Sequence, residues 1–284
     1  MKSLIEKYKD NIIDLYVNKK KSSTEISNLF YVSRSTICRL LKRNGIIARD
    51  NSHRKQKYSI NETIFEKIDT PEKSYWLGLL YADGSHVISK NEIKIFLQEC
   101  DSELIKGFQS FINYTGPLIK RTFKIKHPTW SDQLGCSITN KKLSQDLLKA
   151  GLFQNKTYSL IFPTFISKHL ISHFIRGFFD GDGSISISLR KNENKLQGSF
   201  CIAAPIKFLD SIQDIFINEL GFNKMKYSNL RTKNPIVKVL SYSGSHNLLK
   251  LREYLYQNST ICLTRKKEKF DKVQVYRRRR SQNI

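Results

Sequence analysis

The chain has 284 residues, of which 49 are Lys or Arg and 25 are Asp or Glu, so its formal net charge is +24. This length predicts two or three domains, and a basic excess that runs through the whole chain favours nucleic acid as the partner. The sequence has no apolar run of membrane-spanning length, no signal peptide, and no cysteine spacing typical of zinc or disulfide frameworks. We therefore expect an intracellular protein, cytoplasmic or in an organellar matrix if organelle-encoded, that does not bind membranes.

Residues 1–47 are predicted to form a small all-α domain of three helices, at Leu4–Val17, Ser23–Phe30 and Ser33–Asn44. Its predicted core residues are Ile26, Leu29, Val32, Ile37, Leu40 and Leu41.

The turn before the third helix resembles that of a helix-turn-helix, with Ser33 as N-cap, although Tyr31 stands where such turns often have Gly. A three-helix packing module with a merely basic surface is the alternative. The resemblance places candidate DNA contacts at the front of the recognition helix, namely Arg34, Ser35, Thr36 and Arg39.

A basic linker is predicted over residues 48–68, and the sequence beyond it contains the same pattern of elements twice, over 69–160 and 161–276, before a basic tail at 277–284. Each repeat reads as helix, two strands, helix, two strands, helix. The fold class is therefore α+β, with two pseudo-symmetric αββαββα repeats whose sheets together form a basic, saddle-like surface. The predicted elements between the motif helices are strands His86–Ser89 and Glu92–Gln98, helix Asp101–Asn113, strands from Pro117 and at Trp130–Thr139, helix Lys141–Ala150, strands Ile185–Arg190 and Gly198–Ala203, helix Ile206–Leu220, strands Lys224–Arg231 and Val237–Tyr242, and a helix from His246.

Apolar and polar residues alternate along these strands, so each sheet should have one core face and one polar face. Ile93, Ile95 and Leu97 are predicted to face the core, as are Ile119, Phe123 and Ile125 in the third strand. The candidate DNA contacts on the polar faces are Lys94, Lys120, Lys124, Ser186, Ser188 and Arg190.

Each repeat begins with an apolar helical run that carries two small residues four apart, Gly78 and Ala82 in the first and Gly177 and Gly181 in the second. Such residues share one helix face, and Gly is tolerated inside a helix chiefly where backbones approach closely. We therefore expect the two helices to pack on each other.

An aspartate ends each of these helices, Asp83 in the first and Asp182 in the second, and each is followed by Gly-Ser. Two carboxylates at neighbouring helix C-termini repel each other and oppose the helix dipole, so the arrangement predicts a divalent cation, Mg²⁺ or Mn²⁺, between them. An ordinary Asp-Gly turn is the alternative for one copy alone, but two copies favour the metal site.

At Trp76–Gly84 and Ile175–Gly183 the chain resembles the LAGLIDADG homing endonucleases. The resemblance implies a monomeric, site-specific nuclease that cuts both strands of double-stranded DNA by metal-assisted phosphodiester hydrolysis. The first copy departs at Tyr81, where the family has Asp, but that position is not the metal ligand.

The resemblance also implies further site residues. The backbone carbonyls of Ala82 and Gly181 would join the aspartates at the metal, and Lys156 and Lys266 match basic residues late in each repeat. Both lysines lie in Lys-rich sequence, so a solvated lysine is the alternative at each position. Gln98 matches a polar site residue whose counterpart in the second repeat is Ala203-Ala204, which makes the two halves unequal.

Two other functions fit the same scaffold: an intron maturase that binds intron RNA, and a non-cleaving DNA-binding regulator. A zinc protease does not fit, because His169 and His173 lie four apart without an accompanying Glu. We expect these two histidines on a helix surface.

Overall fold

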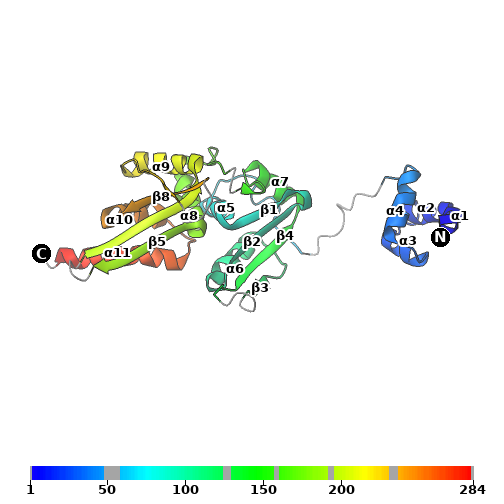
Figure 1. The fold of residues 1–284 in the computed structure, drawn as a ribbon, viewed down its shortest axis with the longest axis horizontal. Coiled ribbons are helices and arrows are strands. Elements are labelled where there is room, and N and C mark those ends of the chain that lie inside the picture. The colour runs from blue at the N-terminus through cyan, green and yellow to red at the C-terminus, as the bar shows by residue number, and fades with distance from the viewer. Residues whose placement is uncertain are drawn as a thin grey trace. The chain divides into compact units, whose positions relative to one another are not determined.

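The computed structural model describes residues 2–47, 58–123, 129–156, 160–190, 195–229 and 236–282. The chain divides into two compact units, residues 1–57 and 58–284, each with a hydrophobic core of its own (Figure 1). The predicted linker is correspondingly shorter. Residues 48–57 lie outside the described part of the chain, whereas Phe65 is buried in the core of the second unit and the Ser59 amide donates to Thr115 Oγ1 at 2.9 Å.

The first unit contains four helices among its described residues: α1 (Lys2–Lys7), α2 (Lys9–Val17), α3 (Ser23–Leu29) and α4 (Arg34–Arg43). The single helix predicted over 4–17 is interrupted at Tyr8, whose ring packs 5.8 Å from that of Phe30. The Ser33 hydroxyl caps α4 as predicted, and the Ser22 hydroxyl caps α3, each by accepting from a backbone amide.

Four of the six predicted core residues of this unit are buried: Ile26, Ile37, Leu40 and Leu41. Val32 is partly buried, and the prediction for Leu29 is wrong, since that residue is 52% exposed. Leu29 ends α3, and the next residue, Phe30, packs against the core in its place.

The second unit contains the predicted repeats, each with one four-stranded antiparallel sheet, ordered β1-β2-β4-β3 and β5-β6-β8-β7. The first repeat comprises α5 (Pro71–Asp83), β1 (Gly84–Val87), η2 (Ile88–Lys90), β2 (Glu92–Gln98), η3 (Glu99–Asp101), α6 (Ser102–Phe111), β3 (Ile119–Arg121), β4 (Gln133–Thr139) and α7 (Lys141–Lys149). The second comprises η5 (Lys168–Leu170), α8 (Ile171–Asp182), β5 (Gly183–Arg190), β6 (Lys195–Pro205), α9 (Ile206–Leu220), β7 (Ser228–Asn229), β8 (Val237–Ser243), α10 (Ser245–Tyr256) and α11 (Thr264–Gln282). Helix α6 packs on the first sheet, and α9 and α10 pack on the second.

The core face of the first sheet follows the predicted alternation in β2 and β4 but not in β3. Ile93 and Ile95 in β2 are 1% exposed, and so is Ile138 in β4. Ile119 pairs with Gly135, which lies on the face opposite to Cys136 and Ile138, and is therefore 41% exposed instead of buried. The pairing with β4 decides which way β3 faces, and three residues alternate too briefly to reveal that register. The predicted continuation of the strand to Ile125 falls partly on residues 124–128, outside the described residues.

Helices α5 and α8 cross the middle of the second unit with their backbones in direct contact (Figure 1). A Cβ atom on Gly78 would lie 2.1 Å from the Phe174 carbonyl oxygen, and one on Gly177 would lie 2.0 Å from that of Tyr75. No side chain fits at either position, so the predicted close approach of the two helices is confirmed.

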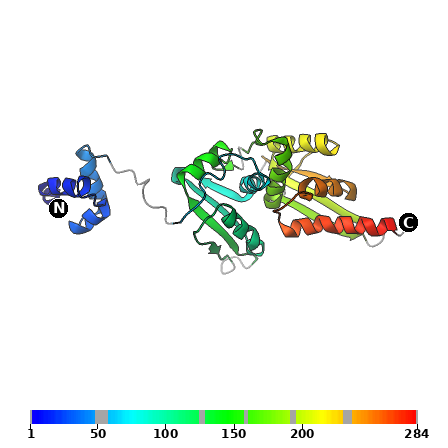
Figure 2. The same cartoon turned by 180° about the vertical axis from the view of Figure 1, so that it is seen from behind.

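Helix α11 runs beside the second sheet, where Lys269 Nζ donates to the Ile185 carbonyl of β5 at 3.0 Å (Figure 2). It continues as far as Gln282, so most of the segment predicted as a basic tail, 277–284, is helical. Across the described ranges, no helix combines the length and apolar character required to cross a bilayer.

Candidate active site

The two motif aspartates occupy equivalent positions, Asp83 as the last residue of α5 and Asp182 as the last residue of α8. Close packing of the helices brings them together, because a Cβ on Gly181 would lie 2.9 Å from Asp83 Oδ2. Both aspartates keep a side open to solvent. The structure thus places two carboxylates side by side at the junction of the repeats.

The pKa values of both carboxyl groups are raised. Partial enclosure by protein, and then the neighbouring Asp182 charge, raise the pKa of Asp83 to about 6, while Lys156 and Lys266 oppose the shift. Enclosure also raises the pKa of Asp182 against the same two lysines. Negative charge at both carboxyl groups is therefore disfavoured unless a cation accompanies it.

Lys156 and Lys266 occupy matching places, each at the C-terminus of one motif helix. Lys156 Nζ donates to the Leu80 carbonyl at 3.1 Å and to that of Gly84. An ammonium group at a helix C-terminus satisfies carbonyls that lack an intrahelical partner and opposes the helix dipole. Desolvation lowers the pKa of both lysines to about 8.

Lys266 is the more deeply held of the two lysines, being 4% exposed. Its ammonium lies within hydrogen-bond distance of four backbone carbonyls, those of Phe179 (2.7 Å), Asp180 (2.8 Å), Gly181 (3.3 Å) and Gly183 (2.6 Å). Three N–H donors are fully occupied by these acceptors. The Lys266 ammonium thus binds the backbone on both sides of Asp182.

Gln98 is the last residue of β2. It lies three residues beyond Ile95, which pairs with Gly84 of β1. This places Gln98 at the same end of the sheet as Asp83, and its Oε1 accepts from Cys100 Sγ at 3.6 Å. Gly183 pairs with Ile202 in the second repeat, so the counterpart of Gln98 is Pro205, one residue beyond the predicted Ala203-Ala204. Neither assignment supplies a polar side chain, and the halves are unequal as expected.

The sequence did not reveal several charged side chains that are buried or paired in the second unit. Arg176 and Asp180 of α8 are 1% and 3% exposed, and Arg265 of α11 pairs with Asp101 of the first repeat through Nε–Oδ1 and Nη2–Oδ2 contacts of 2.9 and 3.0 Å. A charged residue inside an apolar helical run was the available signal for Arg176 and Asp180. The surface position predicted for His173 is wrong, because it is 7% exposed and its Nδ1 accepts from Arg176 at 2.8 Å.

The predicted basic contacts on the first sheet are paired with acidic neighbours. Lys94 Nζ lies 2.9 Å from Glu92 Oε2, and Lys120 Nζ lies 2.6 Å from Glu99 Oε1. The strand register puts Lys120 opposite Leu134, on the core side of the sheet edge. Lys124 lies outside the described residues.

Arg121, which the sequence did not single out, lies on the polar face of this sheet. Its Cζ is 3.2 Å from the centre of the Phe96 ring. That ring covers Gly135 on β4, where an added Cβ would come within 2.5 Å of it.

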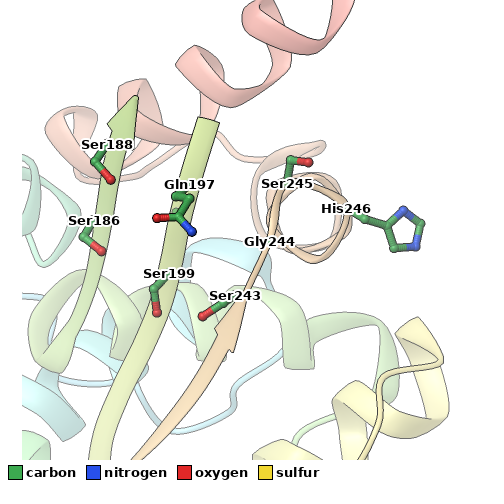
Figure 3. A pocket seen from close by; sticks show the side chains of 9 residues that line it. Ser186, Ser188, Gln197, Ser199, Ser243, Gly244, Ser245 and His246 are labelled. Carbon is green, nitrogen blue, oxygen red and sulfur yellow. The ribbon is translucent and has the colours of Figure 1, made fainter. Parts of the chain in front are cut away.

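The polar face of the second sheet carries short neutral side chains. Ser186 and Ser188 of β5 line a hollow of about 570 Å³ together with residues of β6, β8 and the start of α10 (Figure 3). The side chain of Arg190, the third predicted contact on this strand, is not described. The other lining residues are Gln197, Gly198, Ser199, Ser243, Gly244, Ser245 and His246.

The candidate contacts in the first unit lie in the first turns of α4. Arg34, Ser35 and Arg39 are exposed. The N-cap hydroxyl, Ser33 Oγ, lies 2.8 Å from Ser35 Oγ and 2.7 Å from Thr36 Oγ1, and Arg34 Nε donates to Ser23 Oγ at 3.1 Å. Tyr31, in the turn, has a φ of +51°, the left-handed conformation that favours Gly at such positions.

The two aspartates fit a Mg²⁺ site of the kind completed by substrate. Within the described residues, no three His, Cys, Asp or Glu side chains are grouped to hold a metal. Mg²⁺ is commonly bound through one or two carboxylates plus waters and substrate phosphates, and a cation between Asp83 and Asp182 would relieve their repulsion. Of the two predicted carbonyl ligands, that of Gly181 also accepts from Lys266 at 3.3 Å. The other belongs to Ala82, a half-buried residue next to Asp83 in the chain.

Solved structures share this fold, although the sequence matches no protein-family model and no curated protein. The LAGLIDADG meganuclease I-AabMI bound to uncleaved DNA is similar with a TM-score of 0.50 and 12% identity over 75% of this chain and 92% of that chain. The LAGLIDADG homing endonuclease I-GzeII, in complex with its DNA target, has a TM-score of 0.50 and 14% identity over 75% of this chain and 92% of that chain. For the LAGLIDADG homing endonuclease I-SmaMI bound to cleaved DNA, the TM-score is 0.50 and the identity 15%, over 76% of this chain and 91% of that chain. The chain thus has the fold of the LAGLIDADG homing endonucleases.

Proposed function

We propose that this protein is a site-specific DNA endonuclease that cuts both strands of double-stranded DNA as a monomer. The observation that carries the proposal is the pair of aspartates held together at the C-termini of two helices whose backbones touch. The fold supports it, because its solved relatives include complexes with DNA.

The residues of the site divide the work of phosphodiester hydrolysis. Asp83 and Asp182 would each bind Mg²⁺, one carboxylate for each DNA strand, and the metal when bound supplies an activated water and neutralises charge on the leaving oxygen. Lys156 and Lys266 set the position of the aspartates by binding the carbonyls around them, and their positive charge favours a polyanionic substrate. Two sheets with polar outer faces and a net charge of +24 provide the surface that binds the DNA backbone.

The first unit is proposed to bind DNA as a helix-turn-helix. Arg34, Ser35 and Arg39 are exposed on α4, the helix that would enter the major groove. Arg39 Nε donates to the Ser35 carbonyl at 3.3 Å, which leaves the outer nitrogens of its guanidinium for phosphate or base edges. This unit would lengthen the recognised DNA site without taking part in cleavage.

The test begins with selection of cleaved sites from a randomised double-stranded DNA library in the presence of Mg²⁺. We expect the selected site to be cut by the wild-type chain, and Asp83→Asn and Asp182→Asn to lower cleavage by a factor on the order of 10² or more while DNA affinity changes little, because phosphate contacts dominate affinity. Asp214→Asn, which alters an exposed aspartate on α9, is the matched control and should cleave normally. Wild-type cutting by the double Asn variant would refute the assignment of the aspartates.

A further inference from the structure

A buried polar clamp on α8 holds the connection between α10 and α11. Its two main members, Arg176 and Asp180, are four residues apart and so lie on one helix face. Arg176 Nε donates to the Ile261 carbonyl at 2.9 Å, and its Nη1 donates to that of Leu255 at 2.8 Å. The guanidinium thereby binds the end of α10 and the connection that follows it.

Asp180 binds the other end of the same connection. Its Oδ2 accepts from the Leu263 amide at 2.7 Å and from the Tyr75 hydroxyl at 2.8 Å, and its Oδ1 accepts from the Tyr256 hydroxyl at 3.1 Å. The Leu263 carbonyl in turn accepts from the Lys266 amide at 2.9 Å. The first turn of α11 is therefore anchored to Asp180.

This anchoring determines where Lys266 lies. The Lys266 ammonium binds the carbonyls of Asp180 and Gly183, which stand on either side of Asp182 in the chain. A hydrogen-bonded circuit thus leaves α8, passes through the connection to Lys266, and returns to the backbone around Asp182. Movement of the connection would displace Lys266 and, with it, the end of α8.

Among the described residues, the hydrogen bonds of Lys156 and of the segment that precedes it stay within the first repeat. The counterpart of Asp180 in the first repeat is Tyr81, since each stands two residues before the motif aspartate of its helix. The Tyr81 hydroxyl donates to the Ala150 carbonyl at 2.6 Å. His86 Nδ1, 2.7 Å from the Leu152 carbonyl, donates to it and so carries the ring proton. In the second repeat, by contrast, one donor to Asp180 comes from the other repeat, because Tyr75 belongs to α5.

We propose that Arg176, Asp180 and Tyr75 are positioning residues for the half of the site that contains Asp182 and Lys266, so that cutting of one DNA strand depends on a hydrogen bond from the first repeat. The inference rests on the proposed endonuclease function. Its physical basis is that a buried carboxylate needs all of its donors, and that a small displacement of a reacting group strongly lowers a rate. Cutting of the other strand does not require Tyr75.

Two tyrosines of α5 provide a matched pair of substitutions, because each loses one buried hydroxyl and keeps its ring. The full-length chain carrying Tyr75→Phe is compared with one carrying Tyr81→Phe on a duplex labelled separately on each strand, with Asp182→Asn and Asp83→Asn identifying the strand served by each half. Tyr75→Phe should slow the strand served by Asp182 on the order of tenfold, the scale on which misplaced groups act, and accumulate nicked DNA. Tyr81→Phe should leave that strand unchanged.

Equal slowing of both strands by Tyr75→Phe, or no slowing of either, would overturn the inference. Amide hydrogen exchange provides a second readout that does not need cleavage. The Leu263 amide should exchange roughly fivefold faster in Tyr75→Phe/Tyr256→Phe, as loss of supporting hydrogen bonds predicts, and not in Tyr81→Phe. Unchanged exchange at Leu263 would also overturn it, whereas a wild-type chain that cuts no DNA would count against the proposed function alone.

Discussion

The contact between α5 and α8 makes a quantitative prediction at Gly177. An alanine Cβ there would lie 2.0 Å from the Tyr75 carbonyl oxygen and 2.9 Å from the Leu79 amide nitrogen, both backbone atoms that cannot rotate away. Carbon and oxygen approach to about 3.3 Å at the closest, so the helices must separate by about 1.3 Å. Overpacking of this kind costs up to about 3 kcal/mol, and alanine returns about 1 kcal/mol of helix propensity. We expect Gly177→Ala to lower the free energy of unfolding by about 2 kcal/mol.

Gly107→Ala is the matched control. Gly107 is also inside a helix, α6, but an added Cβ would contact only the Trp76 ring at 3.7 Å, an ordinary van der Waals distance. The helix-propensity gain should therefore dominate, and the protein should become more stable by up to about 1 kcal/mol.

Urea unfolding followed by tryptophan fluorescence measures both variants. The two tryptophans, Trp76 and Trp130, lie in the second unit, so the signal reports that unit and not the first. A unit of this size loses roughly 2–4 °C of Tm per kcal/mol, which predicts a fall of about 4–8 °C for Gly177→Ala. If Gly177→Ala is as stable as the wild type while Gly107→Ala behaves as expected, the helices do not meet at Gly177.

Three further predictions concern pH, metal and domain organisation. Burial and then Arg176 lower the pKa of His173 from 6.5 to about 4 in the folded chain. Between these pH values the unfolded chain therefore binds a proton that the folded chain does not, so the free energy of unfolding should be unaffected above pH 6.5 and lower by about 2 kcal/mol at pH 5. Urea titrations at pH 8 and pH 5 should show a smaller loss of stability in His173→Asn than in the wild type, and an equal loss in the two proteins would contradict the assignment. With Ca²⁺ as the sole divalent cation, gel-shift affinity should persist while cutting fails, because the larger ion fits the geometry of phosphoryl transfer poorly; efficient cutting in Ca²⁺ would contradict this. Deletion of residues 1–57 should leave cleavage at saturating protein intact but shorten the DNase footprint and make the salt dependence of binding shallower, since α4 would no longer contact phosphates; an unchanged footprint and slope would show that the first unit does not touch the target.

The sequence alone was sufficient for the repeated architecture, because its signals are local. Alternating apolar residues, such as Ile93 and Ile95, mark half-buried strands, and Gly221 and Gly151, both with positive φ, end α9 and α7 where predicted. The small-residue positions in the two motif helices also predicted their contact, since Gly177 has no other reason to interrupt a buried helix. These signals were enough to place Asp83 and Asp182 together.

Tertiary structure decided which partners the polar side chains find. Lys120 and Arg121 are neighbours of the same charge, yet strand register directs Lys120 towards Glu99 and Arg121 across Phe96. Asp180 was not singled out in the sequence, but it is buried among donors from Tyr75 and Leu263, which stand far from it in the sequence. Spacing along one chain segment reveals periodicity within that segment, whereas a hydrogen bond between distant segments depends on how sheets and helices are set against one another, and that is settled only when the whole core packs.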